Sequence, residues 1–173
     1  TDPIAVGTNA LSDGTATTSY GGESSAVGTN ATSIGGYSSA NGVNVIAIGT
    51  ARAVGTNVMS LGASSVATGT NVMSLGACSV ATGTNAISIG ADAASTGTNS
   101  MALGAGANAA DDSTALGISA RANGEGSIAL GKNSSAIGNG ALAYGFKASA
   151  NNINTLAIGS SAFANGTNSY AIG

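Results

Sequence analysis

The chain has 173 residues and a net charge of −3, and only 6% of its residues are charged and 3% are aromatic. Because an average soluble domain has about 25% charged residues, this composition excludes an ordinary globular core under a charged surface. The basic residues are Arg52, Arg121, Lys132 and Lys147. So few cations predict no nucleic-acid partner, and the lack of any apolar run of about 18 residues predicts no direct membrane insertion by this segment.

One unit of 14 residues repeats along the chain, most clearly in the three copies between Ala63 and Gly104. Each unit closes with a glycine, and these glycines are Gly7, Gly21, Gly35, Gly49, Gly62, Gly76, Gly90, Gly104, Gly117, Gly131, Gly145, Gly159 and Gly173. The units 50–62 and 105–117 have 13 residues, so the period absorbs two deletions and then resumes. A short fixed period is typical of a solenoid whose coils bury their apolar side only against their neighbours. We therefore predict about twelve coils in a single domain, residues 1–173.

A second glycine lies half a period away, at position 7 when each unit is numbered from 1 to 14. These glycines are Gly14, Gly28, Gly42, Gly55, Gly69, Gly83, Gly97, Gly124, Gly138 and Gly166. Glycine tolerates a positive φ, so two glycines in each unit predict two tight corners and two short strands in each coil. The expected fold class is all-β.

Small and large side chains alternate along the second strand of each unit. Positions 10 and 12 are mostly alanine or serine, whereas position 13 is always large and position 11 is often large. Strand side chains alternate between two faces, so we predict that the small columns of both strands meet inside a thin coil and that the large ones point outward. The opposite assignment, with the large residues inside, is the alternative.

An outward stripe of large apolar side chains would exceed what a monomer normally exposes. We therefore predict that identical chains cover it and that position 13 seals their interface. The predicted interface residues are Ile34, Ile48, Leu61, Leu75, Ile89, Leu103, Leu116, Leu130, Ile158 and Ile172.

The residues needed for common catalytic and metal sites are missing. The chain has no histidine, which excludes Ser-His-Asp and Cys-His catalysis and histidine metal sites. Asp111 and Asp112 are adjacent, but a solvated corner is favoured over a carboxylate pair or a calcium site. We predict no catalytic residue, metal or cofactor, leave the ligand-binding residues unassigned, and expect Cys78 to be a free, accessible thiol.

The segments TNVMSLG, TNAISIG, TNSMALG, GSIALG, NTLAIG and TNSYAIG, each preceded by an Ala-x-Ala-type segment, resemble the head repeats of trimeric autotransporter adhesins, the YadA-like or haemagglutinin-type heads. The resemblance implies a left-handed parallel β-roll assembled as a homotrimer, at the tip of a stalk on a Gram-negative outer membrane. The repeat asparagine of that family maps to Asn30, Asn44, Asn57, Asn71, Asn85, Asn99, Asn154 and Asn168. Departures at Ala16, Asp112, Gly126 and Gly140 predict that any asparagine ladder is broken.

The resemblance also implies the function. A rigid, non-enzymatic rod is expected to attach to host matrix proteins such as collagen, or to cell-surface receptors, and to gain strength by avidity. The alternative is a structural spacer or a self-association module without its own host ligand. Since no neck, stalk or membrane-anchor segment is recognised, we expect residues 1–173 to be an isolated head displayed at the cell surface.

Overall fold

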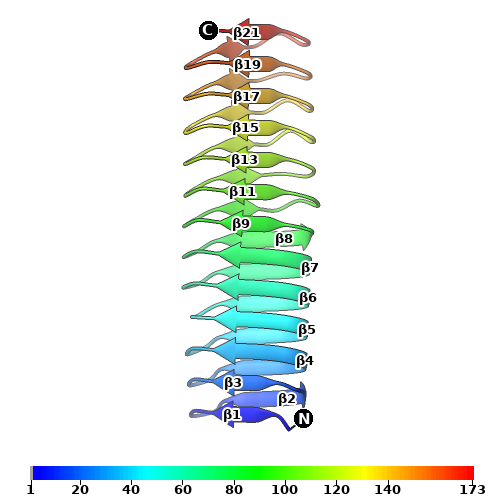
Figure 1. Cartoon of the computed structure of the whole chain (residues 1–173), viewed down its shortest axis with the longest axis vertical. Coiled ribbons are helices and arrows are strands. Elements are labelled where there is room, and N and C mark those ends of the chain that lie inside the picture. The colour runs from blue at the N-terminus through cyan, green and yellow to red at the C-terminus, as the bar shows by residue number, and fades with distance from the viewer. Residues whose placement is uncertain (1) are drawn as a thin grey trace.

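The computed structural model describes residues 2–173 as a stack of coils that forms a straight rod (Figure 1). Each complete coil contains a first strand that begins at position 4 and covers at least positions 4–5, and a second strand at positions 11–13. All strands pair in parallel with the equivalent strands of the coils before and after. The predicted all-β parallel solenoid of about twelve coils is confirmed.

The second strands stack in one column along the rod. They are β1 (Ile4–Val6), β3 (Thr18–Tyr20), β9 (Ile87–Ile89), β11 (Met101–Leu103), β13 (Thr114–Leu116), β15 (Ile128–Leu130), β17 (Leu142–Tyr144), β19 (Leu156–Ile158) and β21 (Tyr170–Ile172). The first strands form another column and are β2 (Leu11–Thr15), β8 (Val80–Thr84), β10 (Ala94–Ser95), β12 (Asn108–Ala109), β14 (Arg121–Ala122), β16 (Ser135–Ala136), β18 (Ser149–Ala150) and β20 (Phe163–Ala164). In four coils both strands merge into one, namely β4 (Ser25–Ile34), β5 (Ser39–Ile48), β6 (Arg52–Leu61) and β7 (Val66–Leu75).

Two corners join these strands. We call positions 7 to 9, between the two strands of a coil, the middle corner, and position 14 through position 2 of the next unit the closing corner. Both 13-residue units keep the strand register, because Ile48 still pairs with Leu61 and Leu103 with Leu116. Each deletion is therefore absorbed in a corner, where a shorter connection leaves the strands in place.

The interior of the rod contains only small side chains. Except in the two end coils, residues at positions 3, 5, 10 and 12 are buried, and nearly all are alanine, serine or threonine. The largest fully buried side chains are Val45 and Val58. The large residues at position 13 lie outside, with Ile89 39% exposed and Leu116 46% exposed. The predicted assignment of faces is confirmed, and the alternative with the large residues inside is wrong.

The corner glycines are required for two different reasons. At Gly83 φ is +117°, and an added Cβ would lie 2.9 Å from the Gly97 carbonyl oxygen. Gly97, Gly124 and Gly138 do not have a positive φ, so the conformational reason given for them was wrong. They are glycines because a Cβ there would overlap the backbone of the next coil. Nothing in the structure explains the glycine at 166.

Buried serine hydroxyls satisfy one another across the corners. The Ser74 and Ser79 Oγ atoms lie 2.7 Å apart, and Ser79 Oγ also donates to the Gly76 carbonyl at 3.0 Å. Equivalent pairs are Ser19–Ser24, Ser33–Ser38, Ser60–Ser65 and Ser95–Ser100. Because a buried hydroxyl without a partner is costly, these pairs let serine replace alanine inside the rod.

Two buried hydroxyls lack such a partner in residues 2–173, those of Ser88 and Ser127. The residue five positions after Ser88, where a pairing serine would lie, is Ala93. The residue five positions before Ser127 is Ala122. Both hydroxyls are therefore buried at a cost.

Ser88→Ala is expected to raise the free energy of unfolding by about 1 kcal/mol, because it removes a buried hydroxyl that has no partner. Ala102 already occupies the same position in the next coil. The matched control is Ser74→Ala, which is expected to lower the free energy of unfolding by about 1 kcal/mol because it breaks the pair with Ser79. Denaturant unfolding at equal protein concentrations would measure both, and equal effects would contradict the prediction.

Candidate interaction surfaces

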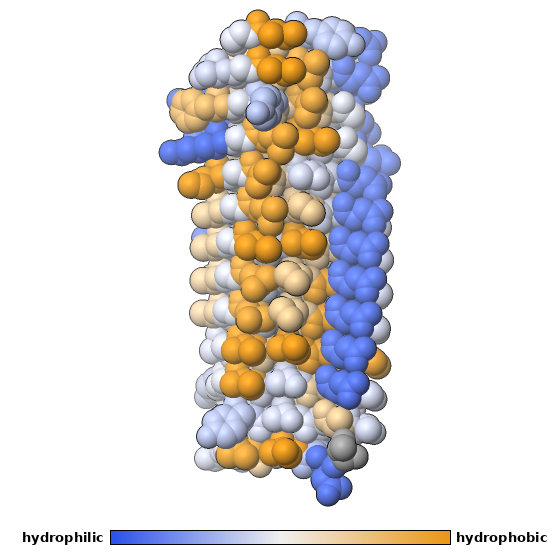
Figure 2. All heavy atoms as spheres, in the orientation of Figure 1, coloured by the Kyte–Doolittle hydropathy of each residue, from blue (hydrophilic) through white to orange (hydrophobic). Residues whose placement is uncertain are grey.

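The second strands expose an apolar stripe along the length of the rod (Figure 2). All ten predicted interface residues lie on it, and strand pairing stacks most of them directly, as with Ile34 on Ile48 and Leu61 on Leu75. The more exposed members are Ile34, Ile48, Ile89, Leu116 and Ile172. The half-buried members are Leu61, Leu75, Leu103, Leu130 and Ile158. Within one chain, the stripe therefore faces outward.

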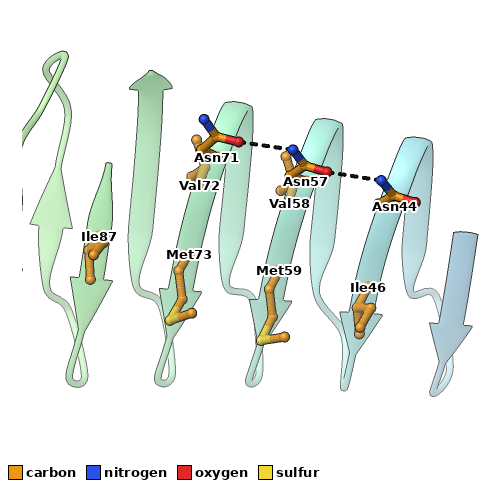
Figure 3. Close-up of a pocket in the computed structure, with 9 residues that line it drawn as sticks. All are labelled: Asn44, Ile46, Asn57, Val58, Met59, Asn71, Val72, Met73 and Ile87. Carbon is orange, nitrogen blue, oxygen red and sulfur yellow. Dashed lines mark hydrogen bonds between the residues drawn. The ribbon is translucent and has the colours of Figure 1, made fainter. Parts of the chain in front are cut away.

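A groove of about 260 Å³ lies along one edge of this stripe (Figure 3). Its lining residues are Asn44, Ile46, Asn57, Val58, Met59, Asn71, Val72, Met73 and Ile87. The asparagines form one wall and the position-11 side chains form the other. Methionine side chains are flexible and polarizable, so this wall can adapt to what covers it. The groove was not predicted from the sequence, although valine followed by methionine in successive units, Val58–Met59 and Val72–Met73, was a signal for it.

The asparagine wall belongs to a long ladder of side-chain amides. From Asn30 to Asn99, each Nδ2 donates to the Oδ1 of the asparagine in the next coil at 2.9–3.0 Å. Asn99 then donates to Asp112 Oδ1 at 2.9 Å. The expectation that Asp112 breaks the ladder was therefore wrong, because a carboxylate accepts the same bond. The gap instead covers Gly126 and Gly140, and Asn154 forms a separate rung to Asn168 at 3.3 Å.

The backbone explains why asparagine recurs in this column. The ladder residues have φ between 51° and 57°. Asparagine tolerates this left-handed conformation better than most residues with a side chain. Position 2 of the closing corner adopts the same conformation, as at Tyr37 and Cys78. The positive φ at position 2 was not predicted from the sequence, because tyrosine and cysteine are not typical of this conformation.

The two adjacent acids act as hydrogen-bond acceptors that hold a corner together. Asp111 Oδ1 accepts from the Thr98 backbone N–H at 2.7 Å, in the unit that lacks its middle-corner glycine. Asp112 accepts from Asn99, as described above. No group of three or more histidine, cysteine, aspartate or glutamate residues that could hold a metal ion occurs in residues 2–173. Cys78 is exposed and free, as predicted.

None of the secondary structure in the described part of the chain is a helix of the length and apolarity needed to cross a membrane.

The repeats of this chain match a known protein family. The sequence profile of the YadA head domain repeat, built from two copies of the repeat, matches residues 26–51, 81–107, 109–134, 131–145 and 150–173, which is more than half of the chain. The chain belongs to the YadA head domain repeat family. In this YadA-type head, the matched segments contain both strand columns and both kinds of corner.

Among solved structures, this YadA-type head is similar to the crystal structure of the collagen-binding domain of the Yersinia adhesin YadA. The identity is 22% and the TM-score is 0.27. The match covers 92% of this chain but only 59% of the other. No curated protein matches the sequence.

Asn71→Asp is expected to lower the free energy of unfolding of this YadA-type head by about 1 kcal/mol at neutral pH. The carboxylate can accept from Asn57 but has no hydrogen to donate to Asn85. The reverse exchange at the last rung, Asp112→Asn, is expected to change the free energy of unfolding by less than about 0.5 kcal/mol, since an amide oxygen also accepts. Denaturant unfolding would measure both free energies. A larger loss of stability from Asp112→Asn than from Asn71→Asp would contradict the donor-to-acceptor direction assigned to the ladder.

Proposed function

We propose that this chain is the head of a surface adhesin that acts without catalysis, as a rigid rod that presents repeated binding surfaces. The observation that carries the proposal is the apolar stripe and its adjoining groove on an uninterrupted solenoid that belongs to the YadA head family. We also propose that the head is displayed at the cell surface of a bacterium with an outer membrane, and the family membership supports this location.

We propose that the head works as a homotrimer sealed by the apolar stripe. Residues such as Ile89 and Leu116 are too exposed in one chain for a stripe of this length to remain in water. Three identical chains side by side would turn the stripe inward. Burial of each large side chain contributes about 1.5–3 kcal/mol, so the sum over many coils favours association.

Ile89→Asp is expected to dissociate or aggregate the trimer, because it would bring three carboxylates together in an apolar seam. The penalty is on the order of several kcal/mol per ion. Since native stability is typically about 5–15 kcal/mol, one substitution repeated in three chains is enough to matter. Light scattering would report the mass of the particle in solution.

The control is Val80→Asp on the first strand of the same coil. Arg52 and Arg121 occupy the same position in other coils, so a charge is tolerated there. This variant is expected to remain trimeric. A trimeric Ile89→Asp beside a dissociated Val80→Asp would mean that the first-strand face, and not the stripe, is the interface.

We propose a host extracellular matrix protein or cell-surface receptor as the ligand. The first-strand face would stay outside in the trimer, and most of its outward residues are uncharged, such as Ser25, Asn41 and Thr82. An extended neutral face suits a long partner, and three such faces on one rod increase binding by avidity.

Solid-phase binding of the purified trimer to a panel of matrix proteins, including collagen, tests this ligand class. The expected result is saturable binding to at least one member, weakened when the trimer is dissociated by Ile89→Asp. The competing function is self-association of heads. Agglutination of head-coated beads together with no binding across the panel would favour that function instead.

A further inference from the structure

The closing and middle corners lie on opposite edges of the rod (Figure 1), yet their side chains vary together in size. At position 1 of the closing corner, large residues occur only as Ile118, Lys132 and Phe146. At position 9 of the middle corner, glycine occurs only as Gly126 and Gly140. Gly126 lies between Ile118 and Lys132 in the chain, and Gly140 lies between Lys132 and Phe146. Because the chain rises by one level in each coil, each glycine lies between two large residues along the rod axis. Packing within one chain does not require this match, because the corners are separated by the strands.

Backbone hydrogen bonds establish the heights. In the closing corner Asn133 N donates to the Ile118 carbonyl at 2.9 Å, and Lys147 N donates to the Lys132 carbonyl at 3.1 Å. In the middle corner Gly140 N donates to the Glu125 carbonyl at 2.9 Å. Each corner is therefore a regular stack with one level per coil, and the closing and middle corners alternate along the chain.

The lower coils show the reverse pattern. There the middle corner holds the asparagine ladder, and the residues at position 1 of the closing corner are small. These are Gly22, Gly36, Thr50, Ala63, Ala77, Ala91 and Ala105. From Asn30 to Asn99 a bulky middle corner thus comes at the same height as a small closing corner, whereas Asn154 lies in the same coil as the large Phe146.

Exposed apolar residues also coincide in height. Val43 and Ile153 are the apolar residues of position 8, and they are 43% and 53% exposed. In the same two coils the closing corner carries the exposed aromatics Tyr37 and Phe146, at 70% and 46%. These coils lie far apart along the rod, so the coincidence occurs twice independently.

Charges follow the same pattern. Lys132 in the closing corner lies at a height between Glu125 and Asn139 of the middle corner, and its side chain is exposed. The middle corner just below Lys132 holds the acids Asp111, Asp112 and Glu125. Lys147 lies one coil above Lys132. The two edges thus carry opposite charge in the same part of the rod.

We propose that the two edges are complementary halves of one interface, so that the closing corner of one copy docks on the middle corner of a second copy, parallel and in register. This inference rests on the proposed trimer and deepens it. Lys132 of one copy then lies beside Glu125 and Gly126 of the next, while Phe146 packs on Ile153. Because two different edges join, the contact is heterologous, and since the proposed docking has no shift along the rod, three copies can close into a ring.

The edges can fix the register of neighbouring chains along the rod, which the apolar stripe cannot do. Position 13 is leucine or isoleucine in most coils, so a shift of one coil between neighbouring chains would leave the stripe covered. The same shift would move Phe146 away from Ile153 and Lys132 away from the glycine levels. The corners therefore fix the register of the chains by penalising the shifted alternatives.

Disulfide formation between copies tests this docking. The variant carries Cys78→Ser, to remove the native thiol, with Tyr37→Cys and Val43→Cys. Cysteine suits position 2, since Cys78 has φ 54° and Tyr37 has φ 59°. Oxidation of the assembled protein is expected to convert single chains into covalent dimers and trimers on a denaturing, non-reducing gel. Each single-cysteine variant is expected to remain uncrosslinked.

The mismatched pair Tyr37→Cys with Ile153→Cys, in the same background, is expected to stay as single chains, and its crosslinking would indicate antiparallel packing and overturn the proposal. Light scattering separates the remaining outcomes. A trimer whose Tyr37→Cys/Val43→Cys pair does not crosslink overturns the edge docking alone. A monomer at all concentrations overturns the proposed trimer as well.

A size exchange gives a second readout. Gly126→Asn suits its own chain, since an added Cβ meets nothing within 4 Å and asparagine is the usual residue of this column. In the assembly it would crowd Lys132 of the neighbouring copy. The concentration at which the trimer dissociates is expected to rise at least about tenfold, and Lys132→Ala in the same chain is expected to restore it. No rescue by Lys132→Ala would contradict the proposed contact.

Discussion

The rod depends on direct backbone hydrogen bonding between every coil and the next. Parallel strands in register hold successive coils about one strand spacing apart, roughly 4.8 Å, and the two strand columns of a coil lie close together. Only small side chains fit between them, so the core consists of alanine, serine and threonine with a few valines such as Val45. The same closeness excludes a Cβ at Gly83 and Gly138. A core so poor in large residues leaves the leucines and isoleucines outside, and this exposed stripe is what supports the proposed association of identical chains.

Repetition also provides hydrogen-bond partners for polar side chains. A side chain that hydrogen-bonds its copy in the next coil satisfies both in one geometry, and the amide ladder from Asn30 to Asp112 extends this over many coils. The interior serines use a different device, because they pair across a corner, as Ser74 does with Ser79. Where a repeat changes one member of a pair, as at Ala93, the remaining hydroxyl of Ser88 is left buried without a partner. Local departures from the repeat therefore have identifiable energetic consequences.

Much of the fold could be predicted from the sequence, because the period of the repeat and the alternation of side chains report strand position and face directly. The alternation separates the small columns from the large ones, and the expectation that the small columns form the core and that Ile89 points outward is confirmed by the burial of each column. The left-handed backbone at Cys78 could not be predicted, since its residue type gives no sign of it. Nor could the role of Asp112 as the last rung, which depends on an acceptor meeting the amide of Asn99 in the next coil. The groove beside Met59 and Met73 could not be predicted from the sequence either, because it is formed by residues from several units that come together only in the folded rod.

Uniform and variable columns have different roles in this molecule. The interior columns and the apolar stripe are nearly the same in every coil, which makes the rod stable but leaves it unable to distinguish one level from another. The corners vary, and their side chains have no packing role inside the rod. Variation at an edge makes one level of the rod different from the next. Lys132 and its large neighbours in the closing corner do this at one edge, and Gly126 and Gly140 do it at the other. In a repeat protein the information that specifies partners therefore lies where the repeat is least regular, because a regular surface binds equally well in every register.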